Sequence, residues 1–360
     1  PAITTELRNK GSYFKVHNDA TATFSNSSTE LNNSDNGFLK IVQDGTVVAE
    51  GDVNNLSSSS IQIDGLFQVK SDWTNDATAS LELSGGPNGE VEFSGSANQN
   101  IGGSTSTVFE KLSINNASGV TLTSNQEVSD TLSFTDGIIT TGANRLDITT
   151  TVDGMVGYGD GKYVVGNFRR YVSPGIDYIL PIGTAANFEL AGIYINSHTG
   201  LTYVDASFTI SDENPVPGGL TVNGVVVDNF LDYGYWTFTP NGGATAVNYH
   251  ATIHSKGHTD LGGTEDNYSL ITDVGSGWQD IGTHSYATQT YSGTAVSAKR
   301  QYLTSFGSYI LGYSSSDLYN PPAITTELRN KGSYFKVHNS TVATVSSSLM
   351  EINNTDNGTI

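Results

Sequence analysis

The first eighteen residues of this sequence occur a second time near its end. Residues 1–18 and 322–339 both read PAITTELRNKGSYFKVHN, an offset of 322 − 1 = 321 positions. Beyond them the copies diverge but keep side-chain character, with Phe24 replaced by Val345, Leu31 by Ile352 and Leu39 by Ile360. An expression tag would not diverge in this way. The pattern predicts a window cut from a longer tandem array, holding one full repeat and the first part of the next.

Composition narrows the classes of protein to consider. A chain of 360 residues suits two domains plus a fragment, and the lack of cysteine means that ordinary cores must hold it together. With 16 basic and 36 acidic residues the formal charge is −20, which makes nucleic acid an unsuitable partner. No apolar run approaches the roughly 18 residues of a membrane span. The start at Pro1, without Met or a signal peptide, carries no information on secretion if the chain is an excerpt.

Residues 1–171 show the pattern of a parallel β-helix. Short alternating segments start 24, 21 and 20 residues apart, at Phe67, Val91, Leu112 and Leu132. Second strands lie between them, at Leu81–Leu83 and Val120–Leu122. Turn signals separate the segments: Asp44-Gly45, Asp64-Gly65, Asn115-Asn116 and Asp136-Gly137. The spacing predicts stacked coils of about two dozen residues. An antiparallel meander is the rival interpretation, although hairpins should place their turns closer together.

Residues 172–313 have longer, more aromatic segments and no helical period. Examples are Tyr203–Ile210, Gly234–Phe238 and Val247–His254, separated by loops rich in Gly and Pro. This pattern of long, aromatic strand segments predicts an antiparallel β-sandwich. Residues 314–321 read as a Pro-containing linker, and residues 322–360 as the start of the next repeat's β-helix. Seven or eight coils at about 4.8 Å each, plus a sandwich, predict an axial repeat of roughly 70 to 90 Å.

Several segments in order resemble repetitive cell-surface proteins of Bacteroidota exported by the type IX secretion system. The resemblance covers most of residues 73–313 and rests on Trp73–Asn75, Gly89–Gly95, Gln99–Gly103, Phe109–Asn116, Ser118–Leu122, Asp136–Gly142, Gly166–Arg170, Leu180–Gly183 and Leu303–Gly307. It implies an extracellular location at the bacterial cell surface and a filament-forming or adhesive role, with gliding-motility adhesins as one branch. It carries over no catalytic residue.

Acidic loops are candidate Ca²⁺ sites, although none matches an EF-hand. The candidate ligands are Asp153, Asp160, Asp212, Glu213, Glu265 and Asp266. Turn formation explains the same residues without an ion. His250, His254 and His258 stand four apart, but the alternation around them predicts a strand. On a strand His250 and His254 share one side yet lie about 13 Å apart, too far for one metal. Apart from structural Ca²⁺, the sequence predicts no cofactor.

Other chemistry is sparse. Asp44, Asp52 and Asp64 would be the carboxylates of a polysaccharide-degrading β-helix, but turns explain two of them, and we expect no enzyme. Trp278 follows Gly275-Ser276-Gly277 in a predicted loop and is the candidate for stacking on a sugar ring, whereas Trp236 alternates with Phe238 and should be buried. The resemblance makes Thr131, in Asp130-Thr131-Leu132, a candidate for O-glycosylation; an ordinary strand residue is the alternative.

Three hypotheses of function follow. The preferred one is a structural repeat of a long extracellular filament or stalk serving adhesion or motility, whose partners are adjacent copies joined head to tail. An alternative is an adhesin module that binds surface glycans through Trp278. A polysaccharide-degrading enzyme is the third.

Overall fold

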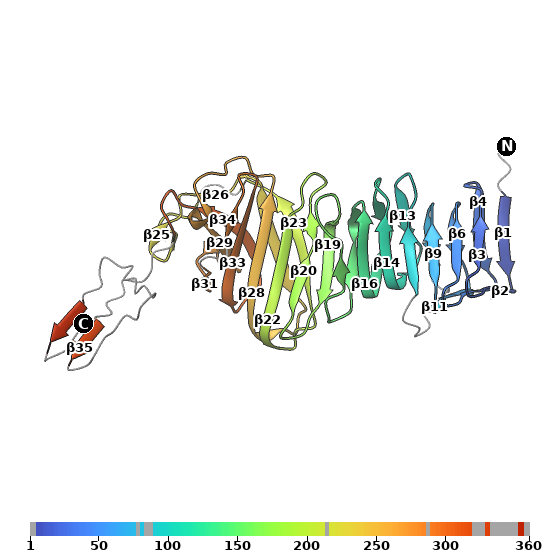
Figure 1. The fold of residues 1–360 in the computed structure, drawn as a ribbon, viewed down its shortest axis with the longest axis horizontal. Coiled ribbons are helices and arrows are strands. Elements are labelled where there is room, and N and C mark those ends of the chain that lie inside the picture. Colours follow the sequence, from blue (N-terminus) through green and yellow to red (C-terminus); the bar gives the residue numbers. More distant parts are fainter. Residues whose placement is uncertain are drawn as a thin grey trace, which may run out of the picture.

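The computed structural model describes residues 5–76, 80–82, 89–212, 216–285, 289–318, 328–331 and 352–355. Within these ranges the regular elements are strands, apart from one 3-10 turn at Glu265–Asn267. The solenoid strands follow one another along a long axis from β1 (Thr5–Lys10), and the antiparallel strands lie beyond them, with β25 (Val225–Val226) on their far side from β1 (Figure 1). No helix in the described part is long and apolar enough to cross a membrane.

The N-terminal part is a β-solenoid of about eight turns. Its first stack pairs in parallel, with register steps of 24 residues from Leu7 to Leu31, 22 to Val53 and 20 to Trp73. The strands of this stack are β1, β4 (Thr29–Ser34), β7 (Val53–Asn55), β10 (Trp73–Asn75), β13 (Gln99–Gly102), β15 (Val120–Leu122), β17 (Ile139–Ile148) and β19 (Val164–Tyr171).

A second parallel stack confirms the predicted spacing. Phe67 pairs with Val91, Val91 with Leu112, and Leu112 with Leu132, the four positions identified from the sequence. Since the pairing is parallel, the antiparallel meander is wrong for this half. The stack contains β3 (Thr21–Phe24), β6 (Thr46–Ala49), β9 (Leu66–Val69), β12 (Glu90–Phe93), β14 (Val108–Asn115), β16 (Gln126–Asp136) and β18 (Met155–Val156).

A third parallel stack supplies a third strand to each of the first coils. It contains β2 (Tyr13–Val16), β5 (Phe38–Ile41), β8 (Ser60–Ile63) and β11 (Ser80–Glu82). The predicted second strands Leu81–Leu83 and Val120–Leu122 belong to different stacks, because β11 pairs with β8 and β15 with β13. Leu83 lies outside the described residues.

Alternating burial explains why these segments stack. In β6, β9 and β12 every second side chain is buried, so each coil contributes apolar groups at the same height of the core. Phe67, Trp73, Phe109 and Phe93 form consecutive ring contacts with centroids 5.7 to 6.2 Å apart. Each such fully buried side chain contributes about 1.5 to 3 kcal/mol.

The pairing changes from parallel to antiparallel at β19. On one side Phe168 pairs in parallel with Leu146 of β17, and on the other it pairs antiparallel with Ala206 of β23 (Tyr203–Ile210). The antiparallel sheet continues through β27 (Gly234–Pro240), β34 (Ser308–Tyr313), β29 (Tyr268–Asp273) and β30 (Trp278–Gln279), with β26 (Asn229–Phe230) beside β34.

A second antiparallel sheet shares this core. It contains β20 (Asp177–Leu180), β22 (Leu190–Thr199), β28 (Thr245–Lys256), β33 (Ala295–Leu303), β31 (Thr283–His284) and β32 (Thr290–Tyr291). Trp236 and Phe238 from one sheet and Tyr249 and Ile253 from the other belong to one buried cluster. The predicted burial of Trp236 is confirmed, since it is 0% exposed.

Three smaller pairings complete the described part. β21 (Ile182–Gly183) is parallel to β19, and β24 (Thr221–Val222) forms a hairpin with β25. β35 (Leu328–Lys331) is parallel to β36 (Ile352–Thr355), with Leu328 opposite Ile352. After subtraction of 321, this is the register of Leu7 opposite Leu31 in β1 and β4.

Candidate functional site

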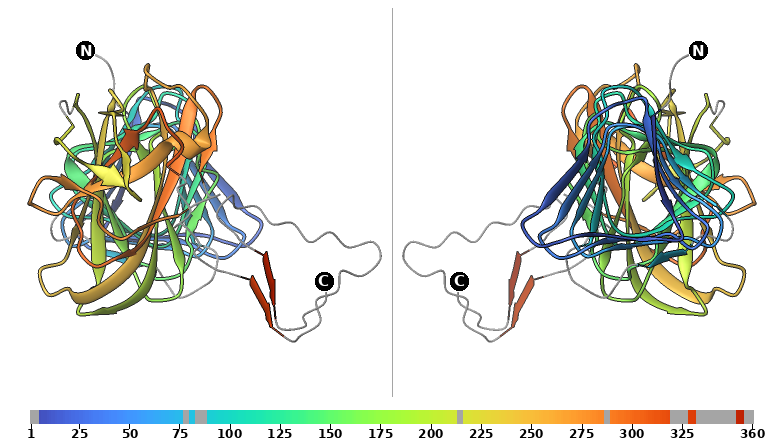
Figure 2. Two further views of the ribbon diagram at one scale, coloured as in Figure 1. Left: turned by 90° about the vertical axis from the view of Figure 1, so that its left-hand side faces the viewer. Right: turned by 90° about the vertical axis from the view of Figure 1, so that its right-hand side faces the viewer.

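The N-terminal end of the solenoid is uncovered in the described part of the chain. Among the described residues, β1, β2 and β3 each pair on one side only, with β4, β5 and β6. Figure 2 looks onto this end in its right-hand view, where the dark blue strands of the first coil lie in front. Three edges therefore present unpaired N–H and C=O groups together. Such edges are templates for pairing with another chain.

Apolar side chains of the first coil are less buried than their counterparts one coil further in. Leu7 and Phe14 are half-buried, whereas Leu31 and Leu39, which pair with them, are 3% and 1% exposed. Tyr13 is 57% exposed and stacks on Phe38 with ring centroids 5.2 Å apart. Between the two coils lies a hollow of about 50 Å³, lined by Leu7, Arg8, Asn9, Phe14, Leu31, Asn33 and Leu39. The end therefore has the composition of a core that lacks its covering layer.

A ladder of buried asparagines runs to this end. Nδ2 of Asn9 donates to Oδ1 of Asn33 at 2.9 Å, Asn33 to Asn55 at 2.9 Å, and Asn55 to Asn75 at 3.1 Å. All four residues are at most 7% exposed. Every amide donates away from the N-terminus, so Asn9 Oδ1 is the acceptor at the start of the ladder. The sequence contained a signal that was missed: these asparagines are 24, 22 and 20 residues apart, the same steps as the coils.

The charge of the first coil differs from that of the whole chain. Residues 5–24 contain three basic and two acidic side chains, 3 − 2 = +1, against −20 overall. Two of the basic groups pair within the solenoid, Arg8 with Glu6 and Lys10 with Asp35 at 3.1 Å. Hydrogen bonds from Arg8 and Asn32 lower the pKa of Glu6. An acidic partner surface would therefore meet less repulsion here than elsewhere on the molecule.

The candidate Ca²⁺ ligands in the described part do not come together. Asp153 accepts from the Met155 N–H at 3.3 Å, whereas Asp160 forms an ion pair with Lys256 at 2.6 Å. Asp212 is exposed and Glu213 lies outside the described residues. Glu265 and Asp266 lie in the 3-10 turn, where burial and then the charges of Asp317 and Glu265 raise the pKa of Asp266. Calcium binding by these residues stays a prediction.

In the described ranges, the side chains close enough to share a metal are those of Asp232, His258 and Asp260. Nδ1 of His258 already accepts from the Tyr233 N–H at 3.1 Å, and Asp232 Oδ1 accepts from the Thr259 N–H at 3.0 Å. Burial lowers the pKa of His258 to about 4, so the ring is neutral. His258 Nδ1 and Asp232 Oδ1 are therefore used in hydrogen bonds within this turn, whereas the buried Nε2 of His258 has no hydrogen-bond partner.

His250 and His254 lie on the strand that the alternation of apolar and polar residues predicted. His250 and His254 are half-exposed on β28, while Tyr249, Ala251 and Ile253 between and beside them are buried. The two histidines therefore share one sheet face, which confirms the expected alternation.

Trp278 and Thr131 have ordinary strand environments. Trp278 lies in β30 and not in a loop, because it pairs with Asp273 of β29. It is half-buried, with its ring 5.6 Å from that of Phe230 and 6.0 Å from that of Tyr235. Thr131 is half-buried in β16 opposite Lys111. Glycan binding by Trp278 and glycosylation of Thr131 stay predictions.

One serine–histidine pair has the geometry of a nucleophile and base but not the exposure. Ser269 Oγ lies 2.9 Å from His284 Nδ1, and Gln289 Nε2 lies 2.8 Å from His284 Nε2. Ser269 is 0% exposed and His284 4%. Because no substrate could reach these atoms without opening the core, the pair serves packing and hydrogen bonding.

Comparison with protein-family models, with curated proteins and with solved structures finds no match to this chain. The candidate site consists of a first coil whose three outer strand edges have no partner among the described residues, a partly filled apolar hollow and the open end of an asparagine ladder.

Proposed function

We propose that this chain is a structural, non-catalytic repeat of a long extracellular filament or stalk on a bacterial surface, serving adhesion or motility. Copies join head to tail, with the antiparallel part forming a β-sandwich between consecutive solenoids. One observation carries the proposal: the sequence of the uncovered first coil resumes at Pro322, shortly after the last strand of the repeat. An end that is costly to leave open in a monomer is covered when repeats follow one another.

The pairing of β35 with β36 supports the same conclusion. These strands have the register of β1 with β4, which is what a second copy of the first coil requires. The type IX secretion resemblance supports an extracellular, surface-attached location. The surplus of acidic groups keeps neighbouring filaments apart.

The proposed mechanism is mechanical. Hydrogen bonds between coils run along the solenoid axis, so tension along a filament is distributed over the parallel stacks at once. About eight turns at roughly 4.8 Å give roughly 38 Å of solenoid per repeat, within an axial period of about 70 to 90 Å.

Electron microscopy of native surface material tests the proposal. We expect filaments with one uniform axial period in that range, labelled along their length by an antibody to this chain. Cells without the gene provide the control. Surface material that contains only globular particles carrying the epitope would refute the filament.

Glycan binding is a second candidate function, and one hollow favours it. A polar hollow of about 370 Å³ lies where the solenoid meets the antiparallel sheet, lined by Asn125, Ala143, Arg145, Asn167, Phe168, Asp205, Ala206, Ser207, Thr237 and Thr239. Guanidinium, amide and hydroxyl groups suit sugar hydroxyls. Binding to a glycan array that Asn167→Ala abolishes and Trp278→Ala leaves unchanged would assign it to this hollow.

A further inference from the structure

The chain leaves the antiparallel part along an anchored path. Ser314 and Leu318 are 1% and 0% exposed, although both fall within the predicted linker. The Ser314 N–H donates to Asn267 O at 2.9 Å, and Asn267 Nδ2 donates back to Ser314 O at 2.9 Å. The Leu318 N–H donates to Asp266 O at 2.9 Å, and Asn223 Nδ2 donates to Leu318 O at 3.3 Å. Residues 314–318 are therefore part of the folded end.

Leu318 fills a small core that is separate from the main one. Its buried members are Val222, Val227, Phe230, Ile271, Ile310 and Leu318, with Val216, Leu220, Val225, Tyr235 and Trp278 packed against them. The β24–β25 hairpin covers this core at the end of the molecule opposite β1 (Figure 1). Next to Val225, Val226 is 54% exposed.

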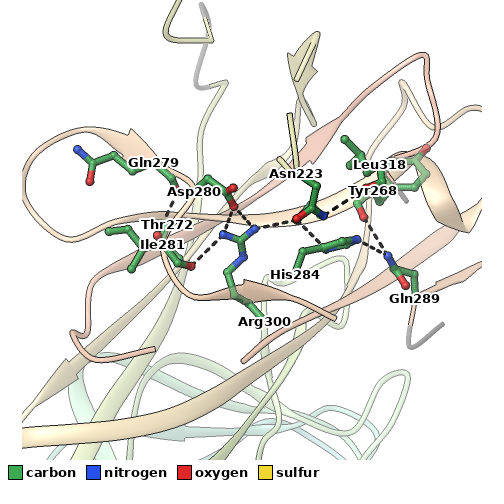
Figure 3. Close-up of polar contacts among 11 residues, drawn as sticks. Asn223, Tyr268, Thr272, Gln279, Asp280, Ile281, His284, Gln289, Arg300 and Leu318 are labelled. Carbon is green, nitrogen blue, oxygen red and sulfur yellow. Dashed lines mark hydrogen bonds and ion pairs between the residues drawn. The ribbon is translucent and has the colours of Figure 1, made fainter. Parts of the chain in front are cut away.

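An ion pair between the buried Arg300 and the exposed Asp280 lies at this end (Figure 3). The guanidinium of Arg300, 0% exposed, binds the Asp280 carboxylate and donates to Ile281 O at 2.9 Å. Asp280 also accepts a hydrogen bond from the backbone of Asn223, in the β24–β25 turn. The hairpin, the segment after β30 and Leu318 are thereby connected through Asn223.

The distance to the next first coil is short. Four residue steps separate Leu318 from Pro322, where the sequence of the first coil resumes. At about 3.3 to 3.6 Å per residue the chain spans at most about 14 Å. The charges are also complementary, because residues 210–318 hold 10 acidic and 3 basic groups, 3 − 10 = −7, against +1 for the first coil.

We propose that this end surface, formed by the β24–β25 hairpin, Trp278 and residues 314–318 and called here the C-terminal seat, receives the open first coil of the next copy. Its half-buried Leu220 and Val225 and exposed Val226 supply the apolar cover that Leu7 and Phe14 lack in the first coil. The joint is then a rigid contact between two folded ends. The inference rests on the proposed function and names the partner surface that it requires.

Cysteine cross-linking tests the seat, because the chain has no cysteine of its own. In the full chain, Val226→Cys is combined with Tyr334→Cys, the equivalent of the exposed Tyr13 in the second copy. A short bis-maleimide should join the two within one chain. Tethering provides an effective concentration on the order of mM, so we expect at least about a tenfold yield over intermolecular products at μM protein.

The matched control pairs Tyr334→Cys with Val152→Cys, a valine of similar exposure, 55%, in the solenoid. Equal yields from both pairs would overturn the seat, because the second copy would then be sampling the whole surface. Val226→Asp should lower the cross-linking of a Gly218→Cys/Tyr334→Cys chain severalfold, and Val152→Asp should not; no difference between them would also count against the seat. Filaments in native material together with a failed cross-link would reject the seat and leave the proposed function standing, whereas absent filaments would reject the function.

Discussion

The asparagine ladder makes a quantitative prediction at Asn55. This side chain is 0% exposed, donates to Asn75 Oδ1 at 3.1 Å and accepts from Asn33 Nδ2 at 2.9 Å and Ser59 Oγ at 2.9 Å. Asn55→Ala removes these three bonds. Ser59 keeps Asn33 O as a partner at 2.8 Å, and Asn33 Nδ2 keeps Ser60 O at 2.8 Å. The main loss therefore concerns the second N–H of Asn33 Nδ2 and the Asn75 Oδ1.

The magnitude follows from what is left unpaired. A net hydrogen bond contributes about 1 kcal/mol, and a buried polar group without a partner costs about 1 to 3 kcal/mol. Two neighbours lose one bond each, so we expect Asn55→Ala to lower the free energy of unfolding by about 2 to 4 kcal/mol. Asn54→Ala is the matched control: Asn54 is half-buried, donates once, to Asn32 Oδ1 at 2.8 Å, and should cost about 0.5 to 1 kcal/mol.

Urea unfolding followed by far-UV circular dichroism measures both variants, and hydrogen exchange shows whether the loss is local to the coils around β7. Equal losses for the two variants, or a loss below about 1 kcal/mol for Asn55→Ala, would refute the argument that the buried ladder stabilises the solenoid.

Three further predictions concern pH and backbone conformation. Burial raises the pKa of Glu189 to about 8, so the folded state keeps a proton that the unfolded state loses above its ordinary pKa of 4.5. The free energy of unfolding should therefore fall as the pH rises from 4.5 to 8. In urea titrations at several pH values, Glu189→Gln should abolish up to about 4 kcal/mol of that fall. Burial lowers the pKa of His258 to about 4, so its contribution to the free energy of unfolding is present above pH 6.5 and is lost as the pH falls toward 4. His258→Asn, whose Oδ1 can replace Nδ1 as an acceptor, should reduce the loss of stability between pH 6.5 and 4. An unchanged loss in this pH range would contradict the assignment. Gly137 has a φ of +89, and an added Cβ would lie 1.8 Å from Asn116 O, so Gly137→Ala should lower the free energy of unfolding by more than about 2 kcal/mol in thermal unfolding. The control Gly142→Ala should lower it by about 1 kcal/mol, because φ is +57 there and no atom lies within 4 Å of the added Cβ.

The solenoid could be predicted from the sequence because its determinants are local and periodic. The steps from Phe67 to Val91, Leu112 and Leu132 are the coil lengths, and each coil repeats the same inward and outward alternation. Parallel stacking then places equal positions above one another. The asparagine ladder obeys the same rule, since its members repeat at the coil period although they are polar.

The candidate site could be predicted only in part. The repeated eighteen residues identified the first coil as the segment that recurs, but its uncovered edges and the hollow beside Leu7 became visible only with the coils in place. The small core around Leu318 gave no sequence signal, since its members come from segments nearly one hundred residues apart. Trp278 was assigned to a loop for the same reason: a two-residue strand is created by its partner, Asp273.

By itself, the sequence determined the coil period and the 321-residue offset between the two copies of the first eighteen residues. These depend on neighbours within one or two coils, where alternation and turn chemistry decide the conformation. Only the tertiary structure decided that β19 pairs in parallel on one side and antiparallel on the other, that Arg300 and Asp280 meet below the hairpin, and that Leu318 is anchored. Those contacts depend on desolvation and packing between distant segments, and neither leaves a period in the chain.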